Sequence, residues 1–173
     1  SAPAEQSRLL LANTSIKNRI PISVHLPCRA IGIATSGAVN QMIQGVFGDE
    51  TVSWLSRQSA KPARLAADNS SDTWMLHFSN DWSLRHEHMP DEIFASEAMG
   101  WLNATLVDHC NEKLAIKHYV SHFWRYAIPA RGADTGTVIA DKEEGVAVIG
   151  DWASGGRVEG AYLSAIELAN YYF

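Results

Sequence analysis

The segment that most constrains the fold of this chain is its end, residues 145–169, which read GVAVIGDWASGGRVEGAYLSAIELA. An apolar stretch typical of a strand runs to Ile149, and a glycine-bearing loop and a helical pattern with small residues follow it. Glycines let the backbone approach a ligand closely, and a helix N-terminus presents unpaired N–H groups to oxygen atoms. Asp151 adds a carboxylate that can accept hydrogen bonds from sugar-type hydroxyls. Since strand–glycine loop–helix units are common, the pattern alone leaves cofactor binding as one interpretation among several.

The chain before this segment combines extended and helical patterns. The best helical pattern opens at Pro90 and places apolar residues at helical spacing from Ile93 to Leu106, and another helix is expected around residues 3–11. Residues 51–59 fit either state. Strands are expected at residues 28–35, 42–47, 74–79 and 116–127, and as a hairpin at 138–141 and 145–150. Together these elements predict an α+β fold, in which helices accompany an antiparallel sheet and the chain ends in a strand–loop–helix unit.

Composition and charge exclude several classes of protein. Hydrophobic residues make up 46% of the 173 residues and charged residues 19%, which is enough apolar material for a core. A net charge of −5 without a basic cluster argues against nucleic acid as a partner, and no stretch is apolar enough to suggest a membrane span. The two cysteines, Cys28 and Cys110, form no CxxC pattern and are expected to be reduced core thiols, as is typical of a cytoplasmic protein.

The segment GDWASGGRVEGAYLSAIELA resembles the C-terminal flavin motif of FAD-containing amine oxidases and renalase-like oxidoreductases. In that family the aspartate meets the ribityl or phosphate region of the flavin, and the helix start lies against the isoalloxazine ring. The resemblance therefore implies FAD as the cofactor and Asp151 as a ribityl or phosphate contact. The other implied cofactor-binding residues are Gly156, Arg157 and Val158 at the helix start, with Glu159, Gly160 and Ala161 completing the motif.

Further segments resemble the same family in the same order. Residues 2–6 resemble the segment that follows a central strand of the FAD domain, and residues 54–64 and 74–83 look like substrate-domain motifs of the bacterial renalase-like group. The segment HFWRYA, residues 122–127, resembles the H-x-W-R-Y-A segment that runs beside the flavin. Only residues 13–50 match poorly.

This resemblance implies two domains. Residues 1–137 are expected to form a substrate-binding domain, with residues 1–12 as a returning piece of the FAD domain, and residues 138–173 are expected to be the C-terminal piece of that FAD domain.

Five residues are candidates for a substrate pocket. His122, Trp124 and Tyr126 share one face of a strand, so they form either an aromatic wall of the active site or a sheet face packed under helices. Lys61 and Arg64 flank Pro62 and lie either near a phosphate or carboxylate of the substrate or in a solvated loop.

Other chemistry has little support in the sequence. His77 and the pair His86 and His88 form no convincing set of metal ligands, and no metal is expected. No G-x-S-x-G elbow is present and neither cysteine has an identifiable base, so no catalytic residue is assigned. The tryptophans at positions 54, 74 and 101 are expected in the core.

A glycine-rich G-x-G-x-x-G motif, which the family uses to hold the ADP half of FAD, does not occur in the chain. We therefore expect an N-terminal FAD-binding half of roughly 150 residues in the intact protein. The intact protein is expected to be an oxidoreductase that passes a hydride from a small-molecule substrate to flavin and is reoxidised by oxygen. Its substrates would be isomers of reduced nicotinamide dinucleotides, or amines. The chain alone is expected to be inactive, and the alternative is a catalytically inactive binding or interaction domain derived from such an enzyme.

Overall fold

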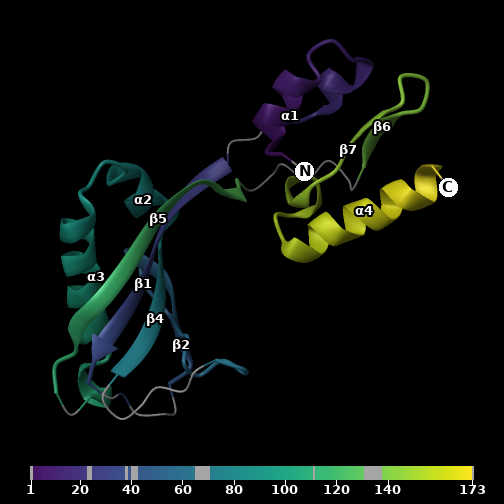
Figure 1. The fold of residues 1–173 in the computed structure, drawn as a ribbon. Coiled ribbons are helices and arrows are strands. Elements are labelled where there is room, and N and C mark those ends of the chain that lie inside the picture. Colours follow the sequence, from purple (N-terminus) through teal and green to yellow (C-terminus); the bar gives the residue numbers. More distant parts are fainter. Residues whose placement is uncertain are drawn as a thin grey trace. The chain divides into compact units, whose positions relative to one another are not determined.

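The computed structural model describes residues 2–22, 25–37, 39, 43–64, 71–110, 112–130 and 138–172. The chain divides into two compact units (Figure 1). Unit 1 comprises Ser1–Leu26 and Arg125–Phe173, and unit 2 comprises Pro27–Trp124.

Unit 2 is built on a five-stranded sheet with the order β2-β3-β4-β1-β5. The pairs β2–β3, β3–β4 and β1–β4 are antiparallel. Both β1 and β5 extend along the chain beyond the limits of unit 2. The strands are β1 (His25–Ser36), β2 (Gly45–Phe47), β3 (Val52–Arg57), β4 (Ser71–Phe78) and β5 (Ala115–Pro129).

Strict alternation in β4 directs one set of side chains into the core. Trp74, Leu76 and Phe78 are buried, while Thr73 and His77 are exposed and Met75 is half-buried. Helices α2 (Asn80–Arg85) and α3 (Asp91–Thr105) follow, and η2 (Val107–His109) is a short 3-10 turn. The core of unit 2 joins the inner face of the sheet to α3, chiefly through Ile31, Ile33, Leu55, Trp74, Leu76, Phe78, Phe94, Ala98 and Leu102.

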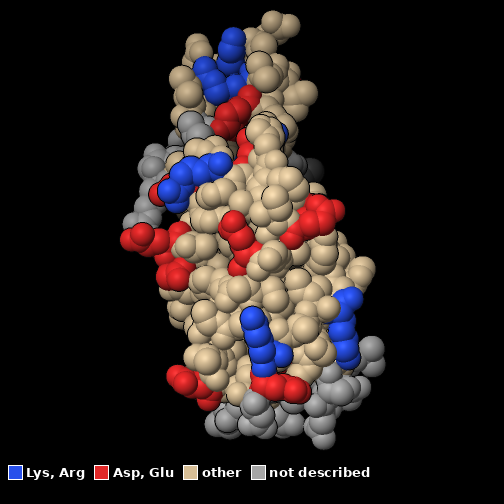
Figure 2. Space-filling view, turned by 90° about the vertical axis from the view of Figure 1, so that its left-hand side faces the viewer, with Lys and Arg blue, Asp and Glu red and all other residues tan. Residues whose placement is uncertain are grey.

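Local hydrogen bonds fix the helices against the sheet. Ser79 caps α2 by accepting a hydrogen bond from the Trp82 backbone N–H at 3.2 Å. The buried Arg29 guanidinium donates to the carbonyl oxygens of His86 and Met89 at 2.8 and 2.7 Å and pairs with Asp91 at 2.8 Å. On the side of unit 2 that these helices cover, acidic and basic side chains lie scattered without a basic patch (Figure 2).

No described helix of unit 2 lies on the opposite face of the sheet (Figure 1). The small residues Gly32 and Ala34 of β1 line its centre. In the antiparallel register they lie opposite Met75 and Thr73 of β4. Aromatic side chains lie towards its edges: Phe47 and Trp54 on β2 and β3, and His122 and Trp124 on β5. We refer to this side as the open face.

Unit 1 contains α1 (Ala4–Leu10), η1 (Ser15–Arg19), a two-stranded hairpin of β6 (Ile139–Asp141) and β7 (Val146–Val148), η3 (Asp151–Ser154) and α4 (Val158–Tyr172). The hairpin is tied to η1 because the Glu144 carboxylate accepts from the Ser15 backbone N–H at 3.0 Å and Ser15 Oγ donates to Asp141 at 2.8 Å. The small core of this unit contains Ile16, Ile20, Ile139, Val148 and Trp152.

The expected mixture of helices and an antiparallel sheet is confirmed. β1 begins at His25, three residues before its expected start. It includes Pro27, which has no backbone N–H to donate to a neighbouring strand. The Pro27 carbonyl oxygen accepts a hydrogen bond from Asn80 Nδ2 at 2.7 Å. Of the expected strand at residues 42–47, residue 42 lies outside the described part. The predicted division into residues 1–137 and 138–173 is a functional one and stays a prediction. Among the described residues, no helix is long and apolar enough to cross a membrane.

Candidate functional site

The loop before α4 makes a tight turn that only glycine adopts easily. Gly155 and Gly156 have φ values of 81° and 73°, in the left-handed region. The Gly156 N–H donates to the Asp151 carbonyl at 2.8 Å, which closes the turn. A Cβ at position 156 would lie 2.6 Å from Pro129 Cγ, so no side chain fits there. The turn therefore brings bare backbone to the surface immediately before the helix.

Asp151 begins η3 with its carboxylate half-buried and available. Its neighbour Trp152 points into the core of unit 1 and donates from Nε1 to the Ala2 carbonyl at 3.0 Å. The Asp151 side chain makes no hydrogen bond or ion pair with another residue in the described part of the chain. A half-buried carboxylate without a protein partner is suited to accept hydrogen bonds from ligand hydroxyls.

The start of α4 separates its residues into exposed and buried positions. Arg157, Val158 and Glu159 are exposed, and the Val158 side chain is 91% exposed. Gly160 is buried against η3 and Ala161 is half-buried. The first-turn N–H groups of any α-helix lack partners within the helix, so this exposed end can donate to an acceptor outside it.

Unit 1 also exposes large apolar side chains on two helices. On α4, Tyr162, Leu163 and Ile166 are 65%, 46% and 44% exposed, while Ser164 between them is buried. On α1, Leu9 and Leu10 are each 77% exposed. Large exposed apolar patches are typical of surfaces that contact another protein segment.

His122 and Trp124 come together on the part of β5 that belongs to unit 2. Their rings meet edge-on with centroids 4.4 Å apart, and Trp124 is 56% exposed. His122 is exposed as well. Their role as a wall of a substrate pocket stays a prediction.

Tyr126 lies farther along β5, in unit 1, and is partly exposed. Its ring meets that of His25 edge-on with centroids 6.0 Å apart. The His25 side chain is buried and its Nδ1 lies 2.8 Å from Glu5 Oε2. No sequence pattern predicted the Glu5–His25 pair, because the resemblance of residues 2–6 to the FAD domain does not point to His25.

Lys61 and Arg64 are both exposed in the segment after β3. Lys61 lines a pocket of about 310 Å³ together with Trp54 and Ser56, whereas Arg64 is not among the lining residues. The structure thus brings together two pairs, His122 with Trp124 and Lys61 with Trp54, rather than the five predicted residues. The expectation that Trp54 belongs to the core was wrong, because Trp54 is half-buried on the open face; Trp74 is in the core as expected.

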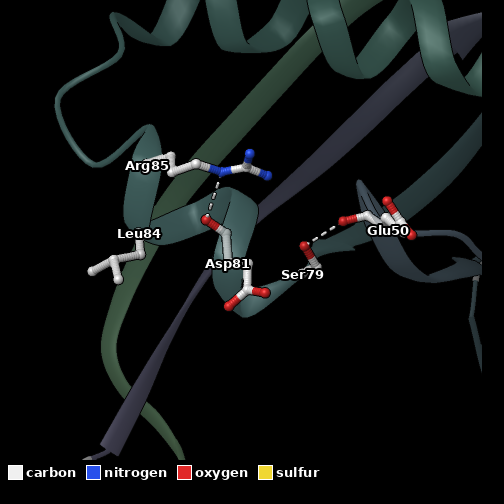
Figure 3. A pocket seen from close by; sticks show the side chains of 5 residues that line it. All are labelled: Glu50, Ser79, Asp81, Leu84 and Arg85. Atoms are coloured by element: carbon white, nitrogen blue, oxygen red, sulfur yellow. Dashed lines mark hydrogen bonds between the residues drawn. The ribbon is translucent and has the colours of Figure 1, made fainter.

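A larger hollow of about 700 Å³ lies beside α2 and is lined by Glu50, Ser79, Asp81, Leu84 and Arg85 (Figure 3). Two of its polar side chains bond to backbone carbonyls of the local fold: Ser79 Oγ donates to the Glu50 carbonyl at 2.6 Å, and Arg85 Nε donates to the Asp81 carbonyl at 3.2 Å. No aromatic side chain lines this hollow. It has no feature that favours a particular ligand.

The side chains considered as nucleophiles or metal ligands, among them the two cysteines and His86, take part in the packing of the fold. Burial raises the pKa of the thiols of Cys28 and Cys110, which disfavours the reactive thiolate. His86 stacks on Trp82 with ring centroids 4.1 Å apart, and its Nδ1 lies 2.8 Å from the Trp82 carbonyl. Within the described residues, no three His, Cys, Asp or Glu side chains converge as metal ligands.

No protein-family model matches the chain.

Proposed function

We propose that this chain carries the substrate-facing sheet and the C-terminal flavin-contacting segment of an FAD-dependent oxidoreductase related to renalase and the amine oxidases. The observation that carries the proposal is the half-buried Asp151 carboxylate, which has no partner among the described residues and lies beside the turn at Gly155 and Gly156. The sequence of the same segment, GDWASGGRVEGAYLSAIELA, resembles the flavin motif of that family.

The residues present fit one edge of a flavin site. The Asp151 carboxylate would accept hydrogen bonds from ribityl hydroxyls, and the exposed start of α4 at Arg157 and Val158 would face the ring system. The backbone at Gly155 allows a flat ligand to approach, because this residue is exposed and a Cβ there would meet nothing within 4 Å. When bound, FAD would supply the hydride acceptor and return the electrons to oxygen with formation of peroxide.

The open face of unit 2 would contact the substrate. His122 and Trp124 present adjoining rings, which position a flat substrate and exclude water from it. The substrates that fit the proposal are isomers of reduced nicotinamide dinucleotides, with amines as the other class.

The apolar surface of unit 1 supports an N-terminal FAD-binding half as the missing partner. Tyr162 and Ile166 on α4 and Leu10 on α1 are exposed apolar side chains that a covering domain would bury. That half would also supply the phosphate-binding loop that the chain does not contain.

The test is a visible absorption spectrum of the full-length product of the source gene, purified without added cofactor. The two absorption bands of oxidised flavin, released as FAD on denaturation, are the expected result. A colourless protein that also fails to take up added FAD would contradict the proposal and favour the inactive binding domain.

A further inference from the structure

A pocket separate from the proposed flavin segment lies in unit 2, on the open face near the edge formed by β2 and β3. Its volume is about 310 Å³, at the lower end of the range for small-molecule sites. Trp54, Ala60 and Pro62 give it apolar walls, while Gln44, Ser56, Arg57 and Lys61 are its polar lining residues; Arg57 is already paired with the buried Asp72, at 2.6 Å.

Trp54 forms a fixed aromatic wall. Its ring packs against Phe47 with centroids 4.9 Å apart, and it also lies beside Gly45 on β2. A Cβ at position 45 would lie 2.9 Å from Trp54 Cη2, so the indole occupies the space above the glycine. The indole is therefore held by β2 on two sides while it lines the pocket.

Lys61 brings an ammonium group to the pocket. Its Nζ donates to Gln58 Oε1 at 2.9 Å, and Gln58 Nε2 donates to Ser56 Oγ at 2.7 Å. Lys61 makes no ion pair with any residue that the structure describes. Two ammonium protons remain for a ligand, and the Ser56 hydroxyl, which accepts from Gln58, can still donate its own proton.

The pocket is positive in a chain whose net charge is −5. No Asp or Glu is among its lining residues. His77 lies opposite Trp54 in the sheet. Its pKa is lowered by partial burial and, in second place, by the positive charge of Lys61, so this charge also acts on the open face. The pocket therefore offers hydrogen-bond donors and positive charge beside an aromatic ring.

We infer that this pocket binds a small ligand in which a flat aromatic ring carries an anionic group, with the ring against Trp54 and the anion at Lys61 and Ser56. A nucleoside monophosphate and an aromatic carboxylate share this chemistry. The inference uses residues of unit 2 alone and does not depend on a bound flavin.

The test is isothermal titration of the full 173-residue chain with four probes. AMP and nicotinate combine a ring with an anion, adenosine has the ring alone, and ribose 5-phosphate has the anion alone. Saturable binding of AMP or nicotinate, at least about tenfold tighter than that of adenosine and ribose 5-phosphate, is expected, since a charge-assisted hydrogen bond and ring stacking each contribute about that factor. The stronger binder of the first pair shows whether the anion is a phosphate or a carboxylate.

Three variants connect the binding to the pocket. Lys61→Gln, an exposed substitution that leaves the fold intact, is expected to weaken binding about tenfold. Trp54→Leu should weaken it by a similar factor, whereas Trp54→Phe, which keeps a ring, should restore most of it. Lys113→Gln, an exposed lysine of the same unit outside the pocket, is the matched control.

Two results would overturn the inference. One is the absence of saturable binding for both AMP and nicotinate into the millimolar range. The other is binding that Lys61→Gln and Lys113→Gln change equally. Neither result bears on flavin binding, which the absorption spectrum of the full-length protein reports separately.

Discussion

The carboxylate of Glu5 holds both the backbone and the side chain of His25. Its Oε1 accepts from the His25 backbone N–H at 2.9 Å, and its Oε2 lies 2.8 Å from His25 Nδ1. The contact connects α1 to the first residue of β1 within unit 1. Because the His25 ring in turn meets Tyr126, the pair fixes the surroundings of one of the residues predicted to contact substrate.

We expect Glu5→Gln to lower the free energy of unfolding by about 1 kcal/mol. Hydrogen bonds to a charged group are stronger than neutral ones, and the partial exposure of Glu5 reduces the effect. Urea denaturation followed by circular dichroism measures the change. Glu143→Gln, an exposed carboxylate in the β6–β7 turn, is the control and should alter stability by less than about 0.5 kcal/mol. Equal losses in the two variants would show that the Glu5 contact contributes nothing.

Gly160→Ala should destabilise unit 1. A Cβ at position 160 would lie 2.4 Å from the Ser154 carbonyl oxygen and 2.9 Å from Ser154 Cβ, so α4 must move away from η3. Overpacking of this kind costs about 1–3 kcal/mol, and the better helix propensity of alanine offsets about 1 kcal/mol of it. The net loss is measurable by urea denaturation.

Gly100→Ala is the matched control for that experiment. Gly100 is exposed in α3, and a Cβ there would meet nothing within 4 Å. Alanine at this position should raise stability by about 0.5–1 kcal/mol through helix propensity alone. If Gly160→Ala raised the stability as Gly100→Ala is expected to do, the close approach of α4 to Ser154 would not be required for the stability of unit 1.

Much of the fold was predictable because it depends on local periodicity. The alternation at Trp74, Leu76 and Phe78 marks a half-buried strand, and the spacing of Phe94, Ala98 and Leu102 marks the buried side of α3. Helix α2 was not predicted, since six residues carry too little periodic signal and its start depends on the single cap at Ser79.

The site was less predictable because it depends on contacts between distant segments. Lys61 reaches Trp54 through the turn after β3, and the position of Trp54 on the open face follows from an irregularity in register between Val52 and Trp54. Such an irregularity changes the face of the sheet on which a side chain lies, and no pattern in this sequence predicts its position. The pairing of Glu5 with His25 likewise requires the fold of unit 1.

Asp91 should make stability depend on pH in the acidic range. The Ser121 hydroxyl that bonds to Asp91, and then the Arg29 guanidinium, hold the pKa of this carboxyl below its ordinary value of 3.8. A lowered pKa in the folded state stabilises the protein above pH 3.8, and this contribution is lost as the pH falls through the folded-state pKa. Since the side chain is 57% exposed, the contribution is less than about 1 kcal/mol.

Asp91→Asn tests this directly. At neutral pH the variant should be slightly less stable than the parent, and the difference should shrink as the pH falls below 3.8. Glu92→Gln changes the adjacent exposed carboxylate, whose side chain makes no hydrogen bond or ion pair within the described residues. Glu92→Gln is the control. If the difference between Asp91→Asn and the parent followed that of Glu92→Gln at every pH, the Asp91 contacts would not contribute to stability.

In the full-length protein, Asp151→Ala should lower flavin occupancy and weaken the affinity for added FAD about tenfold. The Asp151 carboxylate has no partner among the described residues, so its removal costs the fold little, while one charge-assisted hydrogen bond to the ligand contributes about 1.5–3 kcal/mol. The ratio of flavin to protein absorbance measures occupancy, and titration of the stripped protein measures affinity. Asp108→Ala, an exposed carboxylate in η2, serves as the control and should keep the occupancy of the parent. Full occupancy in both variants, in a parent that does bind FAD, would mean that the segment at Asp151 does not contact the flavin.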